Sequence, residues 1–219
     1  MNEQSPGRLA RYSSIALLII AAVAFAAYPM LRGSGSEVGL AGARLYARPA
    51  WLLAHLLGMI GFVTMAVGLG RQDRLAGRLA LTGAILVLPY YGAEAFGLHA
   101  LGLVALATGD PGMIAAADTF RYHPAAITVF AAGLLLLAGC GVRLLIMIRR
   151  PGSMPVRVGL VVTGVALIGY LPQFFTPIEF RIGHGILLGV GLVLLAVAAL
   201  RRTDTASRPS SRTPGPERR

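Results

Sequence analysis

The sequence predicts an all-α integral membrane protein built as a bundle of six transmembrane helices. Of its 219 residues, 56% are hydrophobic and only 13% are charged, whereas a soluble domain of this length carries about 25% charged residues. The chain also contains runs of roughly 20 apolar residues, the length at which a helix crosses a bilayer. Because the segments between these runs are short, we expect one bundle and not several domains.

Six apolar runs account for this prediction, and we expect each of them to form one helix. They cover residues 13–31, 50–70, 79–107, 124–148, 157–175 and 182–200. We therefore divide the chain into a cytoplasmic N-terminal segment over 1–12, a transmembrane domain over 13–202 and a disordered, basic cytoplasmic tail over 203–219.

The first run has some features of a cleavable signal peptide. It follows basic residues and contains an A-x-A sequence at Ala24–Ala26, as cleavage sites do. Its apolar stretch is longer than that of a usual signal peptide, and Pro29 and Met30 extend it further. We therefore expect a retained helix; cleavage would leave five helices and the rest of the topology unchanged.

The arginines predict the orientation, because cytoplasmic loops carry an excess of positive charge. Arginines precede the first run, separate the second from the third and the fourth from the fifth, and follow the sixth. The other loops hold fewer of them, at Arg32, Arg44, Arg48, Arg121 and Arg181. We expect a multi-pass protein of a bacterial inner (plasma) membrane with both termini cytoplasmic. This placement also argues that the net charge of +11 serves the lipid bilayer and not a nucleic acid.

The third run contains the stretch "PYYGAEAFGLH", in which Glu94 stands within an otherwise apolar helix. A carboxylate at membrane depth is costly, so it should face protein or a water-filled cavity and have a partner. Tyr90 and Tyr91 precede it by four and three residues, a spacing that places all three on one face of a helix. We therefore expect Glu94, Tyr91 and Tyr90 to line a polar pocket.

The same stretch predicts a distorted helix. Glu94 and His99 are five residues apart, which is about 140° on an ideal helix, so they face one ligand only if the helix departs from ideal geometry. Pro89, Gly92 and Gly97 offer positions for such a distortion.

The four histidines all fall in the extracytoplasmic half of the predicted topology. His55 lies in the second run and His99 in the third, while His123 and His184 stand at the starts of the fourth and sixth. His123 directly precedes Pro124, which suits the first turn of a helix. Membrane interfaces also favour His and Tyr for their amphipathic side chains, so an interfacial belt is the alternative interpretation.

A weak internal repeat relates residues 55–99 to residues 123–184. Both segments contain Thr-Gly, a proline and Glu-x-x-x-x-His in the same order, although gaps are needed to align them. The repeat would pair the second and third helices with the fourth and fifth in parallel. The glycines around His184 have a simpler explanation in close helix packing, as in Gly185-x-x-x-Gly189.

Three functions fit this pattern. Neutral imidazole binds haem iron and transition metals, so His55, His99, His184 and His123 are candidate ligands of haem b or a metal ion. Alternatively, the pocket passes a small solute or protons, or the chain is a scaffold that packs against a membrane protein or a second copy of itself. The sequence has no G-x-S-x-G motif and no Gly-rich phosphate loop, so we do not expect an enzyme.

Overall fold

The computed structural model describes residues 6–206, with side chains described from residue 12 to residue 200. In this part of the chain every regular element is a helix, as the sequence predicts. Residues 1–5, and 207–219 of the predicted tail, lie outside the described residues. Five described helices are long and apolar enough to cross a membrane. Four of them are α1 (Pro6–Arg32), α3 (Pro49–Gly70), α8 (Pro124–Met147) and α10 (Ile178–Ala206). The other is one long helix in which α4 (Arg74–Gly92), the π-helical turn η1 (Ala93–Gly97) and α5 (Leu98–Thr108) follow one another without a break.

The segment predicted as the fifth crossing, residues 157–175, differs from the others. α9 (Met154–Ile168) has 15 residues, or about 22 Å of helix, which is less than the roughly 30 Å of a bilayer core. The chain then turns and enters the short 3-10 helix η2 (Pro172–Phe175) before α10 begins. The prediction of one continuous helix over residues 157–175 is therefore wrong, because the chain after Ile168 forms a turn and a 3-10 helix.

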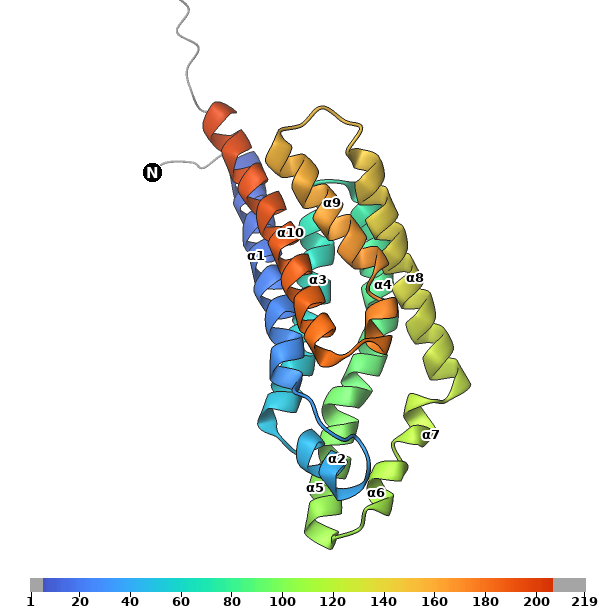
Figure 1. The fold of residues 1–219 in the computed structure, drawn as a ribbon. Helices are drawn as coiled ribbons and strands as arrows, with labels where there is room; N and C mark the ends of the chain where they lie inside the picture. Colours follow the sequence, from blue (N-terminus) through green and yellow to red (C-terminus); the bar gives the residue numbers. More distant parts are fainter. Residues whose placement is uncertain (1–5, 207–219) are drawn as a thin grey trace, which may run out of the picture.

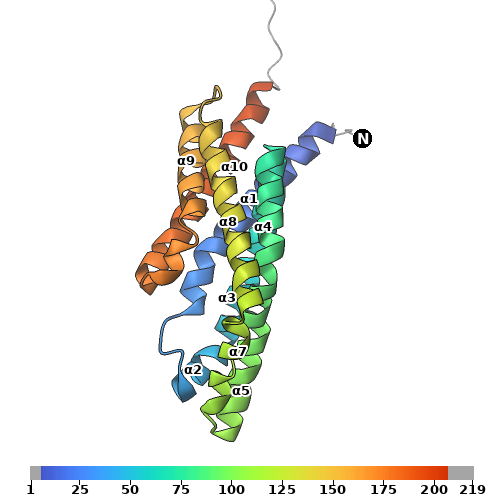
Figure 2. The ribbon, with the colours of Figure 1, turned by 90° about the vertical axis from the view of Figure 1, so that its right-hand side faces the viewer.

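Six helices pack side by side in a closed ring, in the order α1, α3, α4, α8, α9, α10 and back to α1 (Figures 1 and 2). The described start of α1 and end of α10 lie at the same end of this ring (Figure 1). Apolar side chains such as Val23, Ile85 and Leu135 are exposed on its outside, while Leu18 and Phe62 are buried. An apolar exterior of this extent is what lipid contact requires. The predicted repeat, which pairs α3–α4 with α8–α9, stays a prediction.

Glycines allow the helices of the ring to approach closely. A Cβ atom at Gly83 of α4 would lie 2.8 Å from the carbonyl oxygen of Gly133 of α8. One at Gly141 of α8 would lie 2.5 Å from the carbonyl oxygen of Gly164 of α9, and one at Gly185 of α10 would lie 2.5 Å from a backbone oxygen of α1. Any larger residue would force these backbones apart. Close packing through the glycines of α10, as the sequence predicts, is confirmed.

A cap of short helices covers the other end of the ring. It consists of α2 (Gly39–Tyr46), the projecting α5, α6 (Gly112–Ala115) and α7 (Asp118–Arg121) (Figure 1). A small apolar core that includes Tyr46, Trp51, Leu98 and Ile114 joins the cap to α3. Phe120, the neighbour of Arg121 in α7, packs against this core.

Candidate functional site

A cavity of about 480 Å³ lies in the capped half of the ring. Its walls come from α1, α3, α4, η1, α7, α8 and η2, and from the first turns of α10. Part of its wall comes from the chain after the end of α9 at Ile168, at Leu171, Phe174 and Phe175. Ile127, Phe130 and Ala131 of α8 line this part of the cavity, and the ring of Phe130 also stacks on that of Tyr90 of α4.

Glu94 lies at the centre of the polar wall, in the π-helical turn η1. This turn is the departure from ideal geometry that the sequence predicts, and such turns are frequent at functional sites. The side chain of Glu94 is only 8% exposed, and its Oε1 accepts a hydrogen bond of 2.7 Å from Nε of Arg121. The sequence predicts that Glu94 has a partner, and the structure shows that this partner is Arg121. His55 Nε2 lies 3.9 Å from Glu94 Oε2, which is too far for a hydrogen bond.

Arg121 also extends the charged network to Glu37, in the segment between α1 and α2. Its Nη2 donates to Oε2 of Glu37 at 3.1 Å, while Arg32 donates to Oε1 at 2.5 Å. Burial alone would raise the pKa of Glu37, but the charges of Arg32 and Arg121 outweigh it and hold this pKa below its usual value. Burial would lower the pKa of Arg121, yet Glu94, Tyr46 and Glu37 raise it above its usual value.

Trp51 anchors this network to α3. Its indole Nε1 donates to the backbone oxygen of Glu94 at 2.8 Å, and a π-helical turn is where backbone hydrogen bonds change their register. The guanidinium of Arg32 lies 4.7 Å from the centre of the Trp51 ring, a cation–π distance. His55 Nδ1 lies 2.8 Å from the carbonyl oxygen of Trp51, one turn earlier in α3, and this hydrogen bond fixes the orientation of the imidazole.

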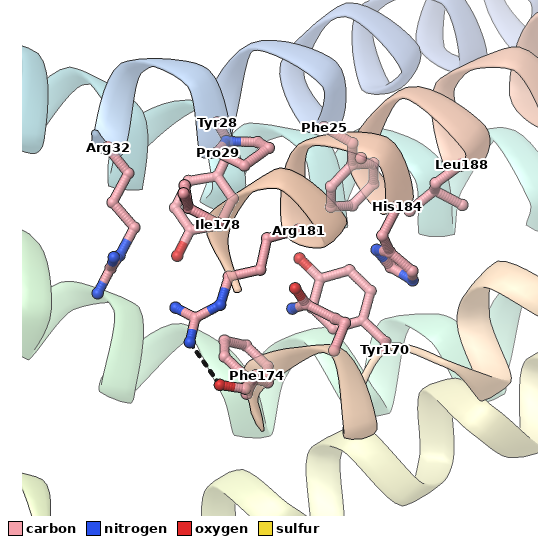
Figure 3. A pocket seen from close by; sticks show the side chains of 12 residues that line it. Phe25, Tyr28, Pro29, Arg32, Tyr170, Phe174, Ile178, Arg181, His184 and Leu188 are labelled. Atoms are coloured by element: carbon pink, nitrogen blue, oxygen red, sulfur yellow. Dashed lines mark hydrogen bonds between the residues drawn. The ribbon is translucent and has the colours of Figure 1, made fainter. Parts of the chain in front are cut away.

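Arg181 is the third arginine of the cavity and has a different kind of partner. Its Nη2 donates to the carbonyl oxygen of Phe174 at 2.6 Å and its Nε to that of Thr176 at 3.0 Å. Figure 3 shows Arg181 and Arg32 extending from α10 and α1 into the same space. Among the described side chains, no carboxylate lies within ion-pair distance of Arg181. Three guanidinium groups therefore face two carboxylates across the cavity.

An aromatic cluster that includes Tyr91, a lining residue of the cavity, lies beside it. Phe25, Phe62, Tyr91 and Tyr170 make ring contacts with centroids 5.1 to 6.1 Å apart. The hydroxyl groups of Tyr91 and Tyr170 lie 3.2 Å apart, within hydrogen-bond distance, and they join α4 to the turn after α9. These contacts join α1, α3, α4 and the turn after α9 inside the ring of helices.

The sequence-predicted residues do not all meet in this cavity. His55, Tyr90, Tyr91 and Glu94 line it. His184 lines an adjoining space of about 20 Å³, shown in Figure 3, that shares Arg32 and Arg181 with the cavity. Its Nε2 lies 2.7 Å from the carbonyl oxygen of Ala166.

The other two histidines lie elsewhere. His99 points to α2, with Nδ1 at 2.8 Å from the carbonyl oxygen of Tyr46. His123 is exposed and caps α8 by accepting a hydrogen bond from the Ala125 backbone at 3.3 Å, so the predicted first turn at Pro124 is confirmed. Among the side chains of residues 12–200, no group of three or more His, Cys, Asp or Glu residues could hold a metal ion.

Arg121 and Arg181 were not among the candidate residues. Both were assigned to extracytoplasmic loops, where a lone arginine carries little information. Their proximity to Glu94 and to each other depends on how the cap and η2 fold over the ring. The one available signal was the expectation that Glu94 needs a cationic partner from some neighbouring segment.

Comparison of the chain with family models, with curated proteins and with solved structures gives no match. The function must therefore be argued from the geometry of the cavity itself.

Proposed function

We propose that this chain is a six-crossing inner-membrane protein whose 480 Å³ cavity binds a small amphipathic anion. In this proposal α9 and η2 together form the fifth crossing, and both termini are cytoplasmic. The crowding of arginines at the end where α1 starts supports this orientation. The cavity then belongs to the extracytoplasmic half of the membrane.

The observation that carries the proposal is the charge of Arg181. A guanidinium in a largely apolar surrounding is costly without an anion nearby, and Arg32 and Arg121 are already paired with Glu37 and Glu94. Arg181 bonds to neutral carbonyl groups instead. With His55 neutral, the cavity carries one excess positive charge, which a bound carboxylate, sulfonate or phosphate would balance.

The apolar wall supports an amphipathic ligand over a simple inorganic ion. The apolar part of the cavity lining consists of Phe130, Phe174, Phe175, Ile127, Ala131 and Leu171. The volume falls within the roughly 300–1,000 Å³ of ordinary small-molecule sites. A short alkyl or aromatic group would therefore pack against the phenylalanines while its anionic end meets Arg181.

A haem or a metal ion fits this arrangement less well. Two axial imidazoles of one haem must face the same space, whereas His55 and His184 line different spaces and His99 and His123 line neither. Neutral Tyr and Phe side chains make up most of the remaining wall. We therefore favour the organic anion over the cofactor.

The test is binding of octane-1-sulfonate to the purified full chain in phosphatidylcholine nanodiscs. Trp51 is the sole tryptophan and contacts Arg32, so its fluorescence reports a ligand in the cavity. We expect saturable binding that Arg181→Gln weakens about tenfold, the effect of losing a charged hydrogen bond. Arg44→Gln, which removes an exposed arginine of α2, is the matched control. Equal binding by both variants would refute the proposal.

Transport is a second candidate, and the aromatic cluster beside the cavity favours it over a fixed binding site. The hydroxyl pair of Tyr91 and Tyr170 and the aromatic contacts around it separate this cavity from the rest of the ring, and another cavity of about 510 Å³ lies at the opposite end. A carrier would open this pair to pass its ligand. Proteoliposomes loaded with octane-1-sulfonate should then release it several-fold faster than loaded liposomes that contain no protein. Saturable binding without faster release would restrict the function to binding.

A further inference from the structure

The cavity at the opposite end of the ring, of about 510 Å³, has a chemistry of its own. It lies where α1 starts and α10 ends, between α1, the turn after α3, α8, α9 and α10. Nothing in the proposed anion site depends on it, because the two cavities share no residue.

The rim of this cavity is basic. Arg71, Arg150 and Arg157 line it together with Gln72, and no acidic side chain is among its described lining residues. Arg150 and Arg157, whose side chains are exposed at one concave space, give this rim a basic character.

One ion pair of the described residues reaches this rim. Asp73 accepts two hydrogen bonds from Arg143, at 3.0 and 2.7 Å, and one of 3.3 Å from Arg150. Arg143 therefore engages both oxygens of this carboxylate. Arg150 keeps a side chain that is 57% exposed, and its remaining N–H groups are available to a ligand at the rim.

The wall of the cavity below the arginines is apolar. Met147, Val156, Leu160 and Leu195 contribute to it. A site with an arginine rim and an aliphatic wall matches a ligand with an anionic head and an apolar or weakly polar body. Basic pockets between transmembrane helices at the cytoplasmic side commonly take the phosphate of a lipid headgroup.

We propose that this cavity binds a phosphate ester through Arg150 and Arg157, with the glycerol or acyl portion against Leu160 and Leu195. Guanidinium groups suit phosphate oxygens because they donate parallel hydrogen bonds. The phosphate belongs either to an anionic phospholipid of the inner leaflet or to a soluble phosphate ester from the cytoplasm, and the two sources are separable by experiment.

The experiment uses the full chain in dodecyl maltoside and follows thermal unfolding through Cys140. This residue is the sole cysteine and is buried, so a maleimide dye reacts with it only as the chain unfolds. Three additions are compared: dioleoylphosphatidylglycerol, dioleoylglycerol, which has the same acyl chains without phosphate, and sn-glycerol 3-phosphate.

A bound phosphate ester should raise the unfolding midpoint by about 3 °C or more at saturating concentration. A rise with phosphatidylglycerol alone assigns the site to a lipid headgroup, and a rise with glycerol 3-phosphate as well assigns it to the phosphate ester itself. No rise with either phosphate, or an equal rise with dioleoylglycerol, would overturn the proposal, even if the chain folds and binds octane-1-sulfonate normally.

Variants of the rim arginines test whether the rise in the unfolding midpoint comes from binding at this cavity. The double variant Arg150→Gln/Arg157→Gln should abolish the rise, whereas Arg78→Gln, an exposed arginine of α4 at the same end, should retain it. The single variant Arg157→Gln serves if the double variant does not fold, because Arg157 is exposed and its loss should weaken the phosphate effect about tenfold. A full rise in these rim variants would contradict the assignment.

Discussion

Arg121 donates a hydrogen bond of 2.7 Å from Nε to Oε1 of Glu94, and this contact joins the cap to the ring. Glu94 comes from the π-helical turn within the third long helix, and Arg121 from the short α7 that precedes α8. Both side chains are largely excluded from solvent, with exposures of 8% and 15%. The contact therefore ties α7 of the cap to the third long helix beside the cavity of about 480 Å³.

Replacement of Arg121 should destabilise the fold because it leaves Glu94 without its cationic partner. Loss of one member of a buried ion pair costs about 3 kcal/mol. Arg121→Gln should thus lower the unfolding midpoint, followed through Cys140 reactivity, by several degrees. Arg44→Gln, an exposed arginine of α2, should change it little. The double variant Arg121→Gln/Glu94→Gln should recover part of the loss; strictly additive effects would show that the pair is not coupled.

The ion pair at the opposite end predicts a pH dependence. The hydrogen bonds from Arg143 outweigh burial and, with the backbone N–H of Ala76, lower the pKa of Asp73 from 3.8 to about 2. A carboxylate with a lowered pKa stabilises the fold above its unfolded pKa and loses this effect as pH falls through the folded pKa. The stabilisation from Asp73 should therefore be complete at neutral pH and disappear between about pH 4 and pH 2.

Asp73→Asn isolates this effect because asparagine still caps α4 but carries no charge. Its unfolding midpoint, followed by circular dichroism because thiols do not react with maleimide in acid, should lie below that of the unchanged chain at pH 7, and the difference should fall to roughly half or less near pH 2.5. Other acidic groups titrate equally in both proteins. A difference that stays constant with pH would contradict the ion-pair explanation.

Two glycines of α8 offer a matched test of the helix packing. A Cβ atom at Gly133 would lie 2.8 Å from the backbone oxygen of Gly83, whereas one at Gly139 would meet no atom within 4 Å. Gly133→Ala should therefore separate α4 from α8 and lower the unfolding midpoint. Gly139→Ala should leave it unchanged or raise it slightly, since alanine favours the helix by about 0.5–1 kcal/mol. Equal effects would argue against the close α4–α8 contact.

The proposed topology is tested by reporter fusions. A fluorescent protein fused after Arg219 should fold and fluoresce in the cytoplasm, and alkaline phosphatase inserted at Gly109, in the turn after α5, should be active outside it. The expectation follows from the placement of the arginines. An active phosphatase after Arg219 would reverse the orientation and move the anion cavity to the cytoplasmic half.

The positions of the long helices could be predicted from the sequence because hydropathy over about 20 residues reflects the membrane directly. The short length of α9 could not, since residues 157–175 are predominantly apolar although the helix ends at Ile168. Pro172 was a visible sign of a break, but hydropathy does not distinguish a spanning helix from a helix followed by a compact apolar turn.

The candidate site was predictable only in part. The cost of a buried carboxylate correctly indicated that Glu94 is buried and paired, and helical spacing brought Tyr90 and Tyr91 to the same cavity. Spacing within one helix does not reveal which face points into the ring, so the four histidines, all expected in one half, lie in different surroundings. Arg121 and Arg181 depend on contacts between distant segments, which no local pattern encodes.

The central claim, an anion in the cavity beside Arg181, is tested most directly with two ligands of the same shape. Octane-1-sulfonate carries a negative charge, and octane-1-sulfonamide replaces one of its oxygens with a neutral NH₂ group. Titrated into the unchanged protein in phosphatidylcholine nanodiscs and followed by Trp51 fluorescence, the sulfonate should bind about tenfold or more tightly, as expected for a charged hydrogen bond. Equal affinity for the two, or no saturable response to either, would contradict the account.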